Sequence, residues 1–149
     1  DSYRGIHDQM AVMRPHPMQN ATLNYLTLPD GYFVELASRY RERVEKLSSA
    51  LACLEFQVVR PEGAYYLFVD FKKVPALQNM NSIEAAMHLL KQVGIACVPG
   101  ESFYGSADSK IRGNYLRFAA CRSDEDLDEA VRRLSNLRRG ATRTSDCEV

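Results

Sequence analysis

The longest regular pattern in this 149-residue chain is an apolar stripe between residues 33 and 54, which constrains the fold more than any other feature. Hydrophobic side chains recur there at spacings of three, four and seven, which places them on one face of an α-helix. Charged residues fill most of the opposite face. A helix of roughly twenty-odd residues with this pattern suits a connector between two domains. The stripe comprises Phe33, Leu36, Ala37, Tyr40, Val44, Leu47, Leu51 and Leu54.

Four short segments after this helix have the composition of β-strands. Aromatic and β-branched residues are frequent in them, and Pro and Gly residues bound several of them. The segments are residues 56–59, 64–71, 95–98 and 115–120. Asn81 with Glu84 in capping-box spacing, and Ser123 before three acidic residues, predict the starts of two more helices. We expect an α/β fold with a small mixed β-sheet, helices packed mainly on one side, and the long interdomain helix preceding it.

The fourth strand segment, Tyr115-Leu116-Arg117-Phe118, contains the most informative residue for function, Arg117. Alternate side chains of a strand point to opposite faces, so Arg117 shares a face with Tyr115 and Ala119 while Leu116 and Phe118 enter the core. A guanidinium stays protonated and can donate two parallel hydrogen bonds to one carboxylate. An Arg on a solvated sheet face, or one paired with a structural Glu, would give the same tetrapeptide.

Further segments, taken together with this strand, resemble those of a known protein family. They are Ile6-His7-Asp8-Gln9, Arg14-Pro15-His16-Pro17-Met18-Gln19, residues 60–71 and residues 93–104. In order and spacing, these segments and the Arg117 strand resemble the C-terminal part of fold-type-I, pyridoxal-phosphate-dependent aminotransferases. The resemblance is nearest to the class I/II group that includes the kynurenine, glutamine, methionine and aromatic aminotransferases. It runs from about Ile6 to about Leu137.

The resemblance implies transfer of an amino group between an amino acid and a 2-oxo acid, with Arg117 binding the α-carboxylate of both substrates. It also implies that residues 1–28 end the large, cofactor-binding domain and that residues 29–139 form the C-terminal small domain of a homodimeric parent enzyme. Residues 140–149 are polar and unpatterned, which predicts a disordered tail.

The family's cofactor-binding lysine, which forms a Schiff base with pyridoxal 5′-phosphate, lies upstream of the Pro-x-Pro stretch, and this chain begins after it. We therefore expect a fragment that contains no catalytic residue, binds no cofactor and is inactive alone, although its parent enzyme needs pyridoxal phosphate. Lys110 has a sequence context superficially like that of the family lysine. Its polar loop setting predicts a solvated surface lysine instead.

Two other residues are candidates for substrate contacts. Tyr104 follows a strand and the Pro99-Gly100 turn, so it is either an aromatic residue at the rim of the site or a packing residue. His16 stands where the resemblance leads us to expect a small residue such as Thr. It either modulates substrate choice or is an exposed loop residue. We find no pair of carboxylates arranged as a general acid and base.

Composition argues against several classes of partner. The formal net charge is zero without any block of like charge, which disfavours nucleic acid and anionic membranes. No apolar run approaches the roughly twenty residues needed to span a bilayer. The cysteines lack C-x-x-C spacing and the histidines are scattered, so we expect no metal site and a reduced, cytoplasmic setting. Cys97 and Cys121 lie in apolar contexts, which predicts buried thiols.

Two other functions fit the same residues. A carbon–sulfur lyase of the same fold would need the same Arg117, and cofactor spectra with and without an added oxo acid would distinguish it from an aminotransferase. A stand-alone, non-catalytic interaction module derived from the small domain would need none of the missing residues. The start at Asp1, without an initiating Met, favours a longer parent over such a module.

Overall fold

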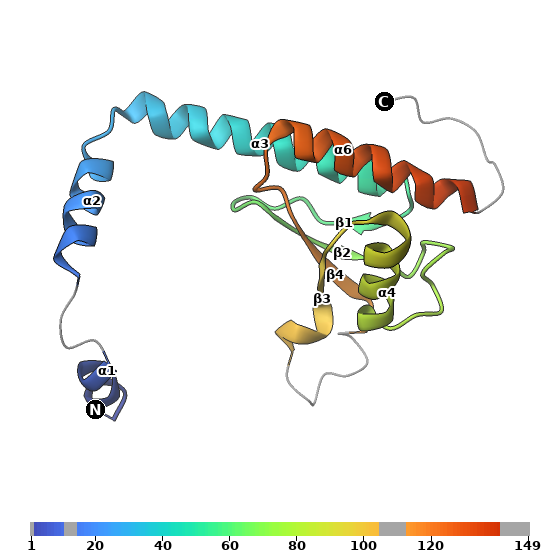
Figure 1. The fold of residues 1–149 in the computed structure, drawn as a ribbon, viewed down its shortest axis with the longest axis horizontal. Helices are drawn as coiled ribbons and strands as arrows, with labels where there is room; N and C mark the ends of the chain where they lie inside the picture. The colour runs from blue at the N-terminus through green and yellow to red at the C-terminus, as the bar shows by residue number, and fades with distance from the viewer. Residues whose placement is uncertain (1, 11–14, 105–112, 141–149) are drawn as a thin grey trace. The chain divides into compact units, whose positions relative to one another are not determined.

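The computed structural model describes residues 2–10, 15–104 and 113–140, with side chains described up to residue 137 (Figure 1). The chain divides into two compact units, residues 1–36 and residues 37–149. Within the described ranges, no helix is both long and apolar enough to cross a membrane. The same ranges contain no group of three or more His, Cys, Asp or Glu that could hold a metal ion. Lys110 and Cys147 lie outside the described residues.

The first unit is helical. Its helices are α1 (Ser2–Met10), α2 (His16–Leu26) and the start of α3 (Asp30–Ala52). Pro17 lies in the first turn of α2, where a backbone N–H has no partner within the helix, so a proline costs little there. Pro15 and Pro17 predict a helix that starts only at Met18, but the observed helix already begins at His16. His16 is an exposed helical residue and not a loop residue.

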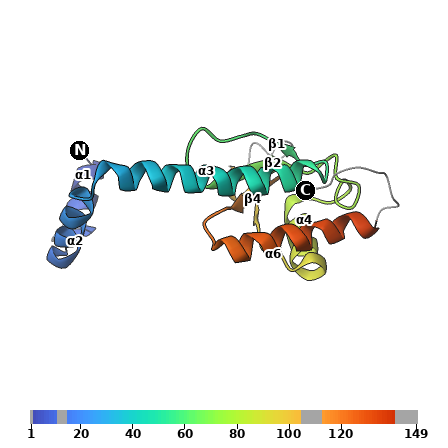
Figure 2. The same cartoon turned by 90° about the horizontal axis from the view of Figure 1, so that it is seen from above.

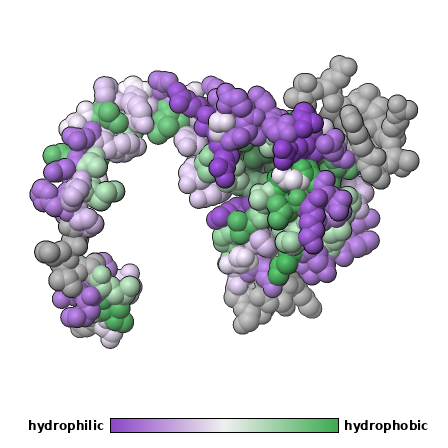
Figure 3. Space-filling model, viewed as in Figure 1, coloured by the Kyte–Doolittle hydropathy of each residue, from purple (hydrophilic) through white to green (hydrophobic). Residues whose placement is uncertain are grey.

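Helices α1 and α2 bury none of their side chains. Ile6, Met10 and Leu26 are 61%, 83% and 69% exposed. Figure 3 shows hydrophobic surface on these two helices, interleaved with hydrophilic residues. Tyr25 packs edge-to-face on Phe33, with ring centroids 5.3 Å apart, and this contact joins α2 to the start of α3. Apolar surface exposed at this density is typical of a region that contacts further protein.

The second unit is built on a four-stranded sheet in the order β1-β2-β4-β3. The strands are β1 (Gln57–Val58), β2 (Tyr66–Asp70), β3 (Val98–Pro99) and β4 (Tyr115–Ala119). Every described pairing is antiparallel, so the prediction of a mixed sheet is wrong. A helical connection leads from β2 to β3, and the two strands run in the same direction. They are not neighbours, because β4 inserts between them and pairs antiparallel with both.

The predicted capping box starts α4 (Ser82–His88). The Asn81 side chain accepts a hydrogen bond from the Glu84 N–H, and the Glu84 carboxylate accepts one from the Asn81 N–H, each at 2.9 Å. The helix continues as a π-helical turn, η1 (Leu89–Val93), and ends at Gly94. The φ of Gly94 is 74°, a left-handed conformation that glycine adopts without strain, so the chain can leave the helix there and enter β3.

The last helix, α6 (Asp124–Leu134), continues as the 3₁₀ turn η4 (Ser135–Gly140). Its predicted cap is present, because the Ser123 hydroxyl accepts a hydrogen bond from the Asp126 N–H at 3.2 Å. Two ion pairs join the second-unit part of α3 to α6, and the two helices lie side by side in both ribbon views (Figures 1 and 2). The pairs are Arg43–Asp124 and Lys46–Asp128.

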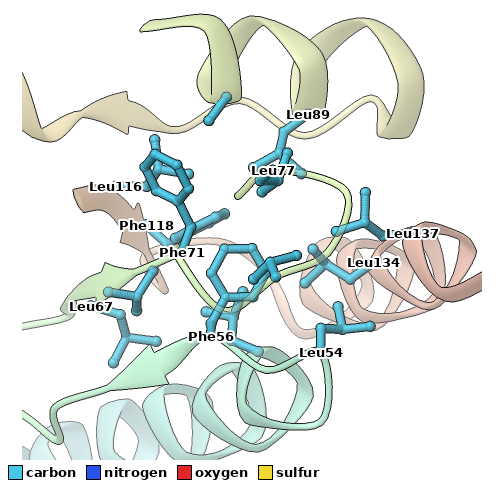
Figure 4. Packing of buried hydrophobic residues seen from close by; sticks show 14 of the residues in the cluster. Leu54, Phe56, Leu67, Phe71, Leu77, Leu89, Leu116, Phe118, Leu134 and Leu137 are labelled. Carbon is cyan, nitrogen blue, oxygen red and sulfur yellow. The ribbon is translucent and has the colours of Figure 1, made fainter. Parts of the chain in front are cut away.

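All three helices of the second unit contribute to one core on one face of the sheet, as predicted. That face presents Leu67 and Val69 of β2 and Leu116 and Phe118 of β4, none more than 3% exposed. Apolar side chains of α3, α4, η1, α6 and η4 pack against them (Figure 4). Burying one such side chain stabilises a fold by about 1.5–3 kcal/mol, so this layer holds the unit together.

Three local predictions differ from the structure. The turn expected over residues 28–31 is shorter, because Asp30 is already the first residue of α3. The third strand, expected over residues 95–98, pairs only at Val98 and Pro99. These two residues lie opposite Arg117 and Leu116 of β4. Cys121 is exposed and not buried, because β4 ends at Ala119 and the chain then turns outward toward α6.

Gly100 lies against the backbone of β4. A Cβ atom built on Gly100 would lie 2.6 Å from the Tyr115 carbonyl oxygen and 2.7 Å from the Tyr115 Cβ. Any larger residue would have to push apart the end of β3 and the start of β4. The glycine therefore permits the close approach of these strands and fixes the start of the 3₁₀ turn η2 (Gly100–Phe103).

We expect Gly100→Ala to destabilise the second unit by about 1–3 kcal/mol, because the added methyl group overlaps backbone atoms that cannot move independently. The matched control is Gly63→Ala, since a Cβ on Gly63 has no heavy atom within 4 Å. Thermal and urea unfolding of both variants measure the difference. Equal stabilities for the two variants would contradict the close approach at Gly100.

Cys97 is only partly buried, whereas the sequence predicted a buried thiol, and we still expect its thiol to react slowly in the folded chain. Burial raises its pKa from about 9 to about 12, so it stays protonated at pH 9, where an ordinary thiol is half ionised. Cys121 is exposed and serves as the internal control. We expect iodoacetamide at pH 9 to alkylate Cys121 quickly and Cys97 slowly, and urea to remove the difference. Peptide mass spectrometry measures each rate, and similar rates in the folded chain would refute the burial of Cys97.

Candidate carboxylate-binding site

Arg117 lies on the face of the sheet that the helices leave open. Its neighbours in β4, Leu116 and Phe118, are buried on the core face, so the predicted alternation is confirmed. In register, Arg117 stands opposite Phe68 of β2 on one side and opposite Val98 of β3 on the other. A backbone paired with strands on both sides is rigid, which gives the side chain a fixed point of attachment.

Two aromatic rings contact the Arg117 guanidinium. Its Cζ atom lies 4.5 Å from the centroid of the Tyr66 ring and 4.8 Å from the centroid of the Phe103 ring. Both distances are within the roughly 6 Å over which a cation is attracted to the face of an aromatic ring. Tyr66 is on β2, diagonal to Arg117, whereas Phe103 is on η2. The guanidinium is thus held by contacts that use none of its N–H groups as conventional hydrogen-bond donors.

The Nε atom of Arg117 is buried and has no hydrogen-bond partner among the described residues. The ion pairs found within those residues do not include Arg117. Asp70, on the same face of β2, instead accepts a hydrogen bond from the Lys72 N–H at 2.8 Å. A buried charged donor without a partner is costly, so an acceptor from outside the described residues would be bound favourably here. The donor geometry of a guanidinium matches a carboxylate.

Local sequence explains why Phe103 reaches this face. Pro99 ends β3, and Gly100 allows the chain to cross closely over Tyr115 before η2 begins. The Phe103 ring then packs edge-to-face on Phe68, with centroids 5.7 Å apart. Phe68 is directly opposite Arg117 in the sheet, so the same contact brings Phe103 to the guanidinium.

Tyr104 is half-buried at the end of η2. Its ring centroid lies 6.3 Å from that of Phe68, so it shares the aromatic layer next to Arg117. No contact between Tyr104 and the guanidinium is found among the described residues. This geometry agrees with a packing residue near the site, and a role at the rim stays a prediction.

His16 belongs to the first unit and is exposed at the start of α2. Arg117 belongs to the second unit, and an influence of His16 on substrate choice stays a prediction.

The described residues suit a carboxylate better than they suit pyridoxal phosphate. Lys46 pairs with Asp128, and the Lys72 ammonium donates to the Gln78 carbonyl at 3.3 Å, so both amino groups are already engaged. We identify no lysine beside Arg117 and no phosphate-binding cluster within the described ranges. The described residues therefore offer a guanidinium that could contact a carboxylate, and the absence of cofactor binding by this chain stays a prediction.

Sequence reasoning missed the two rings that hold Arg117. Alternation along a strand over residues 64–71 would put Tyr65 and Tyr66 on opposite faces, but the chain bends at Tyr65 and the two rings pack together at a centroid distance of 4.4 Å. The diagonal position of Tyr66 relative to Arg117 becomes apparent only once the register of β2 and β4 is known. Pro99 and Gly100 predict a turn, but the position of Phe103 depends on Gly100 crossing over Tyr115, a contact between residues distant in sequence.

Comparison with known proteins gives a consistent result. The family model described as aminotransferase class I and II matches residues 1–134. The chain is 29% identical over 144 residues to the probable kynurenine–oxoglutarate transaminase of Saccharomyces cerevisiae, covering 89% of this chain and 32% of that protein. It is 31% identical over 127 residues to the probable N-succinyldiaminopimelate aminotransferase of Mycobacterium tuberculosis, covering 81% of this chain and 31% of that protein.

Solved structures agree with the fold. The N-succinyldiaminopimelate aminotransferase structure from Mycobacterium tuberculosis matches with a TM-score of 0.75 at 31% identity, covering 87% of this chain and 33% of that one. A mutant aspartate aminotransferase from Thermus thermophilus matches with a TM-score of 0.69 at 30% identity, covering 89% and 34%. The chain thus spans about a third of the length of the relatives it matches.

Proposed function

The chain belongs to the aminotransferase class I and II family, and from this membership we propose that it is the C-terminal part of a pyridoxal-phosphate-dependent aminotransferase. In this proposal the whole enzyme transfers an amino group between an amino acid and a 2-oxo acid. Both substrate classes carry a carboxylate next to the reacting carbon, which is the group that the Arg117 guanidinium fits.

One observation carries the proposal: Arg117 has a buried Nε donor without a partner among the described residues, on a strand that is paired on both sides. A guanidinium that already had an acidic partner would have to break that pair to bind substrate. Among the described residues Arg117 has aromatic contacts and no ion pair, so in this proposal its terminal N–H groups would donate to the α-carboxylate. Two parallel hydrogen bonds would fix the orientation of the substrate about Cα, which contributes to rate through positioning.

Pyridoxal phosphate, when bound, supplies the electron sink on which transamination depends. The described residues of this chain would hold the substrate carboxylate, and the groups that hold the cofactor would come from the remainder of the enzyme. In this division of roles, Arg117 binds and orients the substrate through its carboxylate. No described residue is assigned a proton transfer.

We propose further that residues 1–28, which include α1 and α2, belong to the large domain of a homodimeric enzyme. The exposed apolar side chains of α1 and α2 support this, because they offer a surface that further protein would cover. These side chains are Tyr3, Ile6, Met10, Met18, Leu23 and Leu26.

Replacing Arg117 in the full-length enzyme tests the proposed function. Arg117→Lys keeps the positive charge but loses the two parallel N–H donors of the guanidinium, and Arg117→Ala loses both the charge and the donors. A charge-assisted hydrogen bond is worth about 1.5–3 kcal/mol, so we expect kcat/KM to fall roughly ten- to a thousand-fold, more for Ala than for Lys. The loss should affect every amino-acid and oxo-acid pair, while cofactor affinity should change little. Near-normal kcat/KM for Arg117→Ala on all substrates would overturn the assignment.

The isolated chain should not bind pyridoxal phosphate specifically. We expect borohydride reduction after incubation with the cofactor to give scattered, substoichiometric modification of several lysines, as on any protein surface. The full-length enzyme, treated in parallel, should give one stoichiometric adduct. Mass spectrometry of peptides locates the adducts, and a single stoichiometric adduct on Lys110 or another lysine of this chain would contradict the division of roles.

A further inference from the structure

Among the described residues, the Arg117 guanidinium contacts aromatic rings, and its Nε has no acceptor. Each of its two ring contacts comes from a different element, Tyr66 from β2 and Phe103 from η2. An arginine side chain has several rotatable bonds and loses considerable rotamer freedom when it is ordered. A guanidinium that moved freely would lose this conformational entropy each time it bound a carboxylate, which would weaken binding.

We propose that Tyr66 and Phe103 form an aromatic clamp that orders the Arg117 guanidinium in its carboxylate-binding orientation before substrate arrives. Both are positioning residues that act through Arg117. The proposal builds on the function proposed for Arg117 and adds the residues that determine how well Arg117 performs it.

Ring faces are suited to this task for a physical reason. An Asp or Glu could also order a guanidinium, but its oxygens would occupy the N–H groups that the substrate needs. An aromatic face attracts the cation through its electron density and leaves the N–H groups at the edge of the guanidinium unused. The unpartnered Nε of Arg117 is what such a clamp would produce.

The Tyr66 side of the clamp is itself supported. The Tyr66 hydroxyl donates to the Tyr65 hydroxyl at 3.2 Å, and the two ring centroids lie 4.4 Å apart. Tyr65 packs against Tyr40 of α3 at 5.6 Å, and the Arg43 guanidinium lies 5.8 Å from the Tyr40 ring. A row of rings thus connects Arg117 to α3.

The Phe103 side is supported by packing within the sheet. Phe103 meets Phe68 edge-to-face at 5.7 Å, and Phe68 stacks on Tyr115 at 5.1 Å with the two ring planes 11° apart. Edge-to-face and stacked pairs are favourable arrangements of aromatic rings, so Phe103 has a preferred position against Phe68.

A double-mutant cycle in the full-length enzyme tests the clamp. Tyr66→Leu and Phe103→Leu remove one ring each, and both are made in the native and in the Arg117→Ala background. We expect each to lower kcat/KM for the preferred amino acid about three- to thirty-fold in the native background. In the Arg117→Ala background the same changes should have no further effect, because the residue through which they act is absent.

The conservative variants separate the ring from its substituent. Tyr66→Phe loses the hydroxyl bond to Tyr65 but keeps the ring, and Phe103→Tyr keeps the ring with an added hydroxyl. Both should stay within about twofold of the native kcat/KM, since the face of the ring carries the interaction.

Two readouts distinguish positioning from general damage. Binding of 2-oxoglutarate to the cofactor-loaded enzyme, measured by calorimetry, should weaken about three- to thirty-fold in Tyr66→Leu and Phe103→Leu, while cofactor affinity and melting temperature stay near native. The decarboxylated amine of the preferred substrate lacks the carboxylate. Its slow reaction should therefore proceed at the same rate in the native enzyme and in both Leu variants.

The outcomes discriminate between the two proposals. If Arg117→Ala is strongly impaired but both Leu variants match the native enzyme, the clamp is wrong and the function of Arg117 stands. A loss for the Leu variants that persists in the Arg117→Ala background, or that extends to the amine, also overturns the clamp. If Arg117→Ala is itself unimpaired, both proposals fall.

Discussion

The pairing of β4 with two neighbours at once is the constraint on which the second unit depends. Because β4 is central, its side chains must serve two environments in strict alternation, with Leu116 and Phe118 in the core and Arg117 on the open face. The same hydrogen-bonded ladder therefore closes the hydrophobic layer and fixes the attachment point of the Arg117 side chain. A slip of one residue would bury the charge and expose the core, so stability and site geometry are determined together.

A second constraint joins the edge of the sheet to the site. Gly100 brings the end of β3 against Tyr115, and η2 follows immediately, so the position of Phe103 is a consequence of backbone packing. The aromatic layer of Phe68, Phe103 and Tyr115 then covers part of the open face without placing an acceptor near the guanidinium. In this way an aromatic surface packs around a half-buried guanidinium whose Nε has no acceptor among the described residues.

The sequence predicted features governed by local periodicity and missed those governed by register. The alternation around Arg117, the capping box at Asn81 and the 23-residue length of α3 follow from residues close together in the chain. Strand order does not, because nothing near β4 specifies that it inserts between β2 and β3 and makes the sheet antiparallel. The contacts of Tyr66 and Phe103 with Arg117 were missed for the same reason, since they require that register and the bend at Tyr65.

The two outer strands of the sheet have a consequence for how this chain associates. β1 and β3 pair over only two residues each, and β3 contains Pro99, which has no N–H to offer a further strand. Edges this short are poor templates for adding a strand from another molecule, so sheet extension is an unfavourable route to aggregation. Self-association of the chain would then proceed through helix contacts, because α1 and α2 expose several large apolar side chains, among them Tyr3, Met10 and Leu26.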